Sequence, residues 1–216
     1  VRRDAVENGH REDVPFAVGE RGEHLVQGGS KVMTVARLHH RELVTALAWG
    51  VARKDRAEAL ARLAVDEGGF GNYSDKVTKI NKRVLGVLAD MRDVRTVGVV
   101  EEDPERGLTK VAKPVGVVAA LIPTTGPDAT PPVKALFALK GRNAIVIAPH
   151  PRTKRSTAAV VEYMREACEQ VGAPADLVQA IAEPSIAATQ ELMRQADLIV
   201  ATGGAAMVRA AYSSGT

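Results

Sequence analysis

The chain has 216 residues, of which 45% are hydrophobic and 25% charged, and it carries a formal net charge of +3. This length can hold one large domain or two small ones with a buried core. Nucleic-acid-binding surfaces normally combine a strong basic stripe with stacking aromatic side chains. A chain with 3% aromatic residues and so small a charge excess does not supply one.

A single cysteine, Cys168, excludes an internal disulfide framework and a cysteine-based zinc site, which favours a reducing cytoplasm. No apolar run approaches the ~20 residues that a membrane-spanning helix needs. The polar N-terminal residues do not form a signal peptide, and the first residue is Val1 rather than Met. We therefore expect a cytoplasmic protein without membrane or nucleic-acid partners, of which this chain is a fragment.

Residues 1–38 are polar and rich in glycine, and they show neither a helical nor a strand period. This composition predicts a poorly ordered or only locally structured segment. Four of the five histidines lie in or beside it, without carboxylate or cysteine partners at ligand spacing, so no metal site is expected there. They are His10, His24, His39 and His40.

Residues 39–112 are predicted to form a helical segment and a short β-hairpin. A helical period begins at its start, and Asp55 followed by Glu58 resembles a capping box, which predicts that a second helix begins just after Asp55. Gly68–Gly69 predicts the end of that helix. Ser74 is predicted to cap a third helix, whose apolar residues recur at spacings of three and four.

From residue 113 to 216, apolar strands alternate with amphipathic helices, after a predicted hairpin of runs 96–100 and 108–112. The predicted strands are 115–122, 144–148, 177–181 and 198–201; the predicted helices are 129–139, 153–171 and 185–194, with a last one after Gly203–Gly204. This alternation predicts a Rossmann-like α/β fold, a parallel sheet with flanking helices, here a partial nucleotide-binding domain.

Three turns after predicted strands carry the residues most suited to binding a ligand, because ligands bind at the carboxyl ends of such strands. Each also has a plainer interpretation: a turn that only redirects the chain, a solvated basic loop, and a Gly-Gly pair that alone is weak evidence. No G-x-G-x-x-G follows the first strand, and no Walker A loop is present. The candidates are Pro123, Thr124, Thr125 and Gly126; His150, Pro151 and Arg152; and Thr202, Gly203 and Gly204.

Other reactive side chains are interpreted as structural. Cys168 lies in the middle of a predicted helix, far in sequence from any histidine, which favours a buried core residue over a nucleophile. Asp66–Glu67 and Glu101–Glu102 are interpreted as solvated or capping charges. A basic cluster is predicted to suit a phosphate-bearing small ligand; its members are Arg142, Arg152, Lys154 and Arg155.

Several motifs resemble one known family. PVGVVAALIPTTGPD, FALKGRNAIVIAPHPRTKRST, EPS, ADLIVATGG and MVRAAYSSG occur in the order found in the CoA-acylating branch of the aldehyde dehydrogenase superfamily. Members of that branch include aldehyde–alcohol, acetaldehyde, propionaldehyde and sulfoacetaldehyde dehydrogenases. The resemblance covers residues 43–216 and includes LAVDEGGFGNYSDKVTK, whereas residues 1–38 do not match.

The resemblance implies a reaction in which an aldehyde forms a thiohemiacetal with a catalytic cysteine, hydride passes to NAD⁺, and coenzyme A releases the acyl group. It implies that 123–127 lies beside the reacting carbonyl and the nicotinamide. It also places 150–152 along the adenosine ribose and 202–204 near the pyrophosphate. A small aldehyde and coenzyme A would be the substrates, and the intact protein a homo-oligomer. NAD is expected to be preferred with NADP accepted, because Thr153 stands where hydrolytic relatives carry an acidic residue.

Two departures from the family follow from the residues. The family usually has Asn where this chain has Gly126, and that side chain helps to hold the developing oxyanion. The family's catalytic cysteine has no counterpart in the chain, so we expect the fragment to be inactive alone. The alternatives are a non-catalytic nucleotide-binding or assembly remnant, and a hydrolytic aldehyde dehydrogenase, against which the PTTGP and PHPR turns argue.

Overall fold

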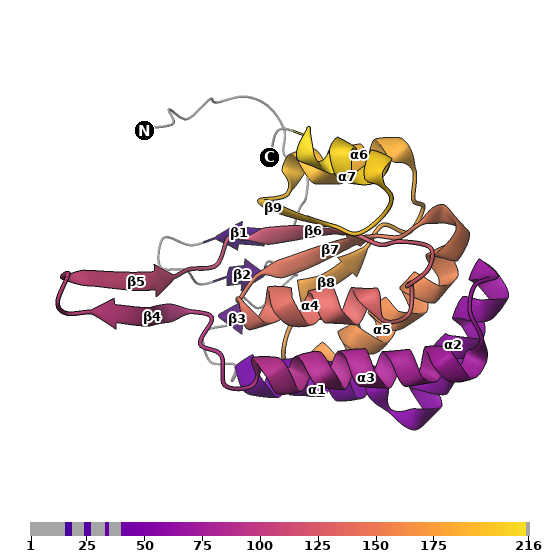
Figure 1. The fold of residues 1–216 in the computed structure, drawn as a ribbon, viewed down its shortest axis with the longest axis horizontal. Helices are drawn as coiled ribbons and strands as arrows, with labels where there is room; N and C mark the ends of the chain where they lie inside the picture. Colours follow the sequence, from indigo (N-terminus) through magenta and orange to yellow (C-terminus); the bar gives the residue numbers. More distant parts are fainter. Residues whose placement is uncertain (1–15, 19–23, 27–32, 35–39, 215–216) are drawn as a thin grey trace. The chain divides into compact units, whose positions relative to one another are not determined.

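The computed structural model describes residues 16–18, 24–26, 33–34 and 40–214 (Figure 1). The chain divides into two compact units, Val1–Arg37 and Leu38–Thr216. In the first unit, strands β1 (Phe16–Val18), β2 (His24–Val26) and β3 (Met33–Thr34) form an antiparallel sheet in that order. The predicted poor order of residues 1–38 falls mostly outside the described residues.

The second unit begins with helix α1 (His40–Ala52), followed by α2 (Lys54–Gly68). The capping box predicted at Asp55 is wrong. Arg53 is the N-cap residue and makes no side-chain cap, while the carboxylate of Asp55, already inside the first turn, pairs with the Arg53 guanidinium at 2.7 Å. Gly69 ends α2 as predicted, with a left-handed φ of 68° that favours glycine.

Helix α3 (Tyr73–Met91) is capped by Asn72 and not by Ser74 as predicted. The Asn72 side chain accepts a hydrogen bond from the backbone N–H of Asp75 at 2.9 Å, and the Ser74 hydroxyl donates to the same oxygen. A capping residue must have extended backbone just before the first turn. Asn72 has it (φ −120°, ψ 161°), whereas Ser74 is already helical.

An antiparallel hairpin follows the helices. Strands β4 (Gly98–Asp103) and β5 (Leu108–Ala112) pair with an irregularity between Val99 and Glu101. The hairpin agrees with the prediction, although β4 begins two residues later. Three of its apolar side chains, Val99, Leu108 and Val111, are exposed.

A four-stranded parallel sheet confirms the predicted fold class. Its order is β8-β7-β6-β9, formed by β6 (Val117–Leu121), β7 (Ala144–Ala148), β8 (Val178–Ala180) and β9 (Leu198–Ala201). The intervening helices are α4 (Thr130–Lys140), α5 (Lys154–Gln170), α6 (Ile186–Gln195) and α7 (Ala205–Tyr212), with short 3₁₀ turns η2 (Pro151–Thr153) and η3 (Ala175–Leu177). From β6 the chain moves outward to β8 and then returns to β9 on the other side of β6.

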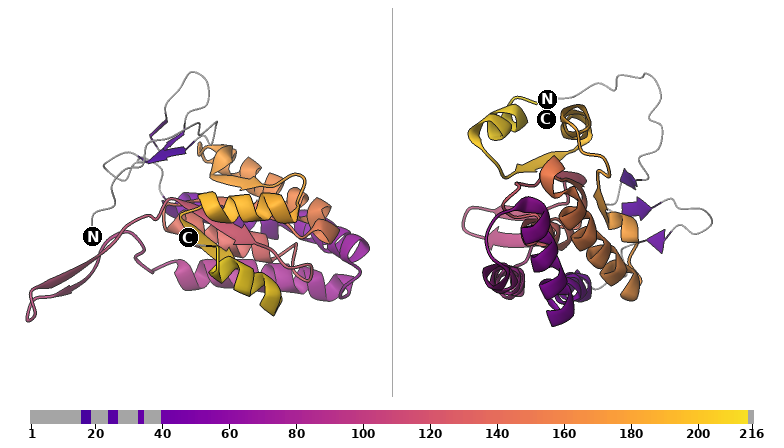
Figure 2. Two further views of the ribbon diagram at one scale, coloured as in Figure 1. Left: turned by 90° about the horizontal axis from the view of Figure 1, so that it is seen from above. Right: turned by 90° about the vertical axis from the view of Figure 1, so that its right-hand side faces the viewer.

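The two faces of the sheet are covered unequally. Helices α4 and α5 cover one face, with α1–α3 packed outside them, and α6 and α7 lie on the other (Figure 2). The large core joins α1–α5 to one side of the strands and includes Leu47, Leu136, Ile145 and Met164. A much smaller cluster, centred on Met193, lies under α6 and α7. Among the described residues, no helix is long and apolar enough to span a bilayer.

Candidate functional site

All three candidate turns lie at the carboxyl edge of the parallel sheet, because each follows a strand of the same direction. Backbone hydrogen bonds tie them to one another. Thr202 N donates to Leu121 O at 3.2 Å, which joins the end of β9 to the end of β6, and Ile122 N donates to Ala148 O at 3.0 Å, which joins β6 to β7. From β6 the chain proceeds to β7 and β8 on one side, and it then returns to β9 on the other side of β6. The boundary between β6 and β9 is the switch point of the sheet, and in such sheets a crevice for ligands opens there.

A groove of about 270 Å³ opens at this edge, lined by the ends of β6 and β7 and by α6 and α7. Its lining is mostly apolar and includes Ile186, Met193 and Met207. His150 and Pro151, from the turn after β7, form part of its wall. Such a shape, apolar with polar turns at one side, is typical of a small-molecule site.

The turn after β6 is tightly closed around Gly126. Its N–H donates to Pro123 O at 3.2 Å, and its carbonyl accepts from Thr130 N at 3.1 Å. A Cβ atom at Gly126 would lie 2.5 Å from the Thr130 hydroxyl oxygen. The family usually has Asn at this position, and an Asn side chain here would require the Thr130 side chain to rotate away. The Thr130 hydroxyl thus occupies the space that a side chain at residue 126 would need.

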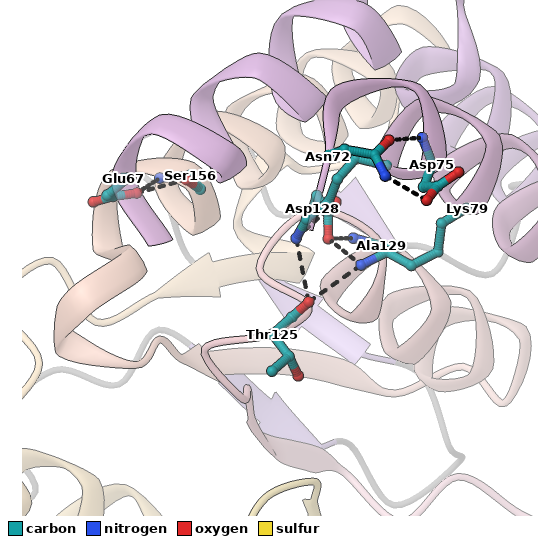
Figure 3. Close-up of polar contacts among 9 residues, drawn as sticks. Glu67, Asn72, Asp75, Lys79, Thr125, Asp128, Ala129 and Ser156 are labelled. Atoms are coloured by element: carbon teal, nitrogen blue, oxygen red, sulfur yellow. Dashed lines mark hydrogen bonds and ion pairs between the residues drawn. The ribbon is translucent and has the colours of Figure 1, made fainter. Parts of the chain in front are cut away.

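The same turn is held from outside by two lysines of α3 (Figure 3). Lys79 Nζ lies 2.9 Å from one carboxylate oxygen of Asp128, and Lys76 Nζ lies 3.5 Å from the other. Both ammonium groups also donate to the Thr125 carbonyl, at 3.2 and 3.3 Å. Asp128 is fully buried and also accepts from Ala129 N. Sequence inspection missed this cluster, because nothing in the local spacing relates α3 to a turn nearly 50 residues later.

Lys134 is a second buried cation at the switch point. Its Nζ donates to Leu121 O and to Val200 O, both at 2.7 Å, so that it bridges the ends of β6 and β9. Burial lowers the pKa of this lysine to about 8. Among the described residues, no carboxylate forms an ion pair with it. The sequence offered no sign of this role, since a lysine on an amphipathic helix is usually solvated.

The turn after β7 holds its basic residues in different ways. His150 Nδ1 accepts from Arg152 N at 3.1 Å, which caps η2. The Arg152 guanidinium donates to Gly68 O at 3.4 Å, and Lys154 pairs with Glu183 at 2.6 Å. The predicted basic cluster is wrong in including Arg142, which follows α4 and precedes β7 and so lies at the opposite, amino edge of the sheet.

The turn after β9 leads directly into α7. Gly204 is the N-cap residue, and a Cβ atom there would meet nothing within 4 Å. A Cβ atom at Gly203 would lie 2.6 Å from the Met207 sulfur. The backbone around Gly204 is therefore open to an incoming group. The binding roles of Thr202, Gly203 and Gly204 stay predictions, as do those of the other two turns.

Cys168 is unsuited to nucleophilic chemistry. It is fully buried in α5, and burial raises the pKa of its thiol to about 12. The thiolate is the reactive form of cysteine, so this thiol is inert at neutral pH. In the part of the chain that the structure describes, no three His, Cys, Asp or Glu side chains gather in a way that would hold a metal ion.

Glu67 has a role that the sequence only partly suggests. One carboxylate oxygen accepts from Arg155 N at 2.8 Å and the other from Ser156 N at 2.7 Å. The Ser156 hydroxyl donates a third bond, and Figure 3 shows the contact between Glu67 and Ser156. These N–H groups are the second and third of α5, which the N-cap side chain of a helix normally takes. Thr153 is that N-cap residue, and its fully buried hydroxyl oxygen has no partner. A capping charge was one of the two interpretations of Glu67, but its target lies 88 residues away.

We predict that Glu67 and Thr153 are energetically coupled. Replacing Glu67 by Ala frees two N–H groups that the Thr153 hydroxyl can accept from after a rotation, so E67A is expected to lower the free energy of unfolding by only about 1 kcal/mol. T153A is expected to be nearly neutral. The double variant, left without any cap, is expected to lose about 1 kcal/mol more than the sum. Urea unfolding of the four proteins measures this coupling, and strict additivity would contradict it.

The sequence model of the Aldehyde dehydrogenase family matches residues 34–216. The chain belongs to this family. A sulfoacetaldehyde dehydrogenase from an Acholeplasma species is 52% identical over 171 residues, which make up 79% of this chain and 35% of that protein. The acetylating succinate-semialdehyde dehydrogenase of Clostridium kluyveri is 47% identical over 161 residues, or 74% of this chain and 36% of the relative. The resemblance to the acylating branch is therefore confirmed.

Solved structures agree with this placement. An acetylating aldehyde dehydrogenase from Geobacillus thermoglucosidasius superposes with a TM-score of 0.78 at 43% identity, over 82% of this chain and 39% of that one. A Rhodopseudomonas palustris propionaldehyde dehydrogenase solved with bound CoA gives 0.71 at 29%, over 82% of this chain and 40% of that one. The chain thus spans little more than a third of these relatives.

Proposed function

We propose that this chain is the nicotinamide-dinucleotide-binding portion of an enzyme that converts an aldehyde to an acyl-CoA, with NAD and coenzyme A. The observation that carries the proposal is the apolar groove at the carboxyl edge of the sheet, lined by the ends of β6 and β7, by the turn after β7 and by α6 and α7. A dinucleotide needs an apolar slot for its adenine and open backbone for its phosphates. The groove between α6 and α7 and the turn at Gly203–Gly204 fit those two needs.

Different residues would contact different parts of the dinucleotide. The side chains of Ile186 and Met207 would pack against the adenine, and His150 and Pro151 would border its ribose. Gly204, with no neighbour within 4 Å of a Cβ position, would let the pyrophosphate approach the backbone. The turn 123–126 would face the nicotinamide end. NAD, when bound, supplies the hydride acceptor for the oxidation.

The aldehyde is proposed to be short and to carry an anionic group. The two relatives described above are named for sulfoacetaldehyde and succinate semialdehyde, which end in a sulfonate and a carboxylate respectively. The nucleophile for acyl transfer would lie elsewhere in the intact protein, because Cys168 is buried and its thiol pKa is raised.

We predict that the 216-residue chain binds NADH saturably but forms no acyl-CoA from aldehyde, NAD and coenzyme A. Titration followed by NADH fluorescence measures the first property, and a thioester assay the second. Ile186→Glu is expected to weaken binding about tenfold, because it removes an apolar contact and adds a charge repelled by the pyrophosphate. Ile186 is 80% exposed, so this change spares the fold.

A matched control is Tyr212→Glu, which changes an even more exposed apolar residue outside the groove lining. It is expected to bind NADH normally. Failure of the unmodified chain to bind NADH would overturn the proposal, and rapid aldehyde oxidation by the chain would contradict the absence of a usable nucleophile. The alternative function is a non-catalytic nucleotide-binding module, which predicts the same NADH binding. The two functions are distinguished by the intact native protein, which forms acyl-CoA under the first proposal and forms none under the alternative.

A further inference from the structure

The carboxylate of Glu67 lies at the first turn of α5, directly after the turn that follows β7. Counting from β6, strand β7 is the second strand of the doubly wound sheet, and the turn after the second strand meets the adenosine ribose. An acidic side chain there favours NAD, and a nearby arginine accommodates the 2′-phosphate of NADP. Residues 149–155 contain no carboxylate, but they contain Arg152, Lys154 and Arg155.

Helix α2 brings a negative charge to this turn from outside. Glu67 receives the backbone N–H groups of Arg155 and Ser156 with both of its oxygens. It therefore fills the end of α5 where a phosphate group would otherwise find free donors. The buried, unpartnered hydroxyl of Thr153 beside it shows that the site is taken by a group from another helix in place of the local cap.

The end of α2 also lies against the turn after β7, where the ribose is proposed to bind, and against the turn after β6. A Cβ atom on Gly68, the next residue after Glu67, would lie 3.1 Å from the Thr153 methyl group and 3.8 Å from the Thr124 carbonyl oxygen. Arg152 donates to Gly68 O, and its guanidinium carbon lies 5.5 Å from the centre of the Phe70 ring. The negative charge of Glu67 and the positive charge of Arg152 therefore both lie beside the turn after β7, where the ribose is proposed to bind.

We infer that Glu67 is a specificity-determining residue that disfavours a 2′-phosphate and so selects NAD over NADP. The inference rests on the proposed function and names the selectivity of that same site. Lys154 is already paired with Glu183, so Arg152 and Arg155 are the cations left to oppose Glu67. Because of them NADP still binds, but more weakly than NAD.

The test is Glu67→Gln, with the dissociation constants of NADH and NADPH measured by fluorescence titration on the same chain. The NADPH affinity is expected to rise about three- to tenfold at low ionic strength, the size of one screened charge near a dianion, while the NADH affinity stays unchanged. The matched control Asp66→Asn removes the same charge from the neighbouring, exposed residue and is expected to leave the ratio of the two constants unaltered.

A second pair of variants separates charge from helix capping. In E67Q/T153D and E67Q/T153N the cap of α5 comes from residue 153 in both, and the two differ only in its charge. The Asp variant is expected to regain the NAD preference and the Asn variant to lack it. Equal ratios in this pair, or an unchanged ratio in E67Q, would overturn the inference while NADH binding upholds the proposed function. If the unmodified chain binds neither NADH nor NADPH, both the inference and the proposed function are overturned.

Discussion

Replacing Asp128 by Ala is expected to lower the free energy of unfolding by about 3–5 kcal/mol, the usual effect of removing one partner from a buried ion pair. Asp128 is fully buried, and the Lys76 side chain is only 6% exposed. Burial lowers the pKa of Lys76, and the attraction of Asp128 opposes that shift. Without the carboxylate, two ammonium groups face each other beside a single carbonyl, that of Thr125.

The measurement is urea unfolding at neutral pH, with the ellipticity of the helices as signal. Asp90→Ala, an exposed carboxylate on α3, is the control and is expected to change stability by less than about 0.5 kcal/mol. D128A/K76M is expected to be more stable than D128A, because it removes the cation that the first change leaves unpaired. A D128A protein as stable as the control, or no recovery in the double variant, would contradict the assignment.

The local signals in the sequence predicted the elements well. The apolar runs 144–148 and 198–201 coincide with β7 and β9, and Gly69 and Gly172 end their helices with positive φ, as glycines at such positions should. The predicted caps failed at Asp55 and Ser74, because α2 begins at Lys54 without a side-chain cap and α3 is capped by Asn72, two residues before Ser74. The backbone conformation at the helix start decides which residue is the N-cap, and composition does not.

The candidate turns were also predictable, since the order of strands and helices places them at one edge of the sheet. The contacts that hold these turns in place were not predictable. Glu67 reaches the end of α5 across 88 residues, and Lys76 reaches the Thr125 carbonyl across 49. Such contacts depend on how α2 and α3 pack against the α/β layer. A single sequence carries local periodicity but not these distances.

The contribution of Lys134 to the stability of the protein is expected to rise between about pH 8 and pH 10.5. The buried thiol of Cys168, whose pKa is raised to about 12, acts in the opposite direction above pH 9, so a comparison with a Lys134 variant is needed to isolate the effect. The pKa of Lys134 is lowered from 10.5 to about 8 in the folded chain by burial. Between these values the unfolded chain binds a proton that the folded chain does not, so raising the pH favours folding. The full contribution of this group across the interval is roughly 3 kcal/mol.

Lys134→Met removes this dependence. The variant keeps a long unbranched side chain in α4 but loses the two bonds to Leu121 O and Val200 O. Urea unfolding of both proteins at several pH values from 7 to 11 gives the difference in their stabilities. That difference is expected to move in favour of the unmodified protein as the pH rises, whereas Lys82→Met, at an exposed lysine of α3, is expected to show no such trend.

A difference that stays constant with pH would contradict the burial of an unpaired ammonium group at the switch point. The opposite trend, in which the unmodified protein loses its advantage at high pH, would indicate a carboxylate partner that raises the pKa instead of lowering it. Either result would also concern the position of the turn after β9 at this edge of the sheet. Lys134 and Thr202 N both donate to Leu121 O, so the position of the turn after β9 relative to β6 depends on the same carbonyl.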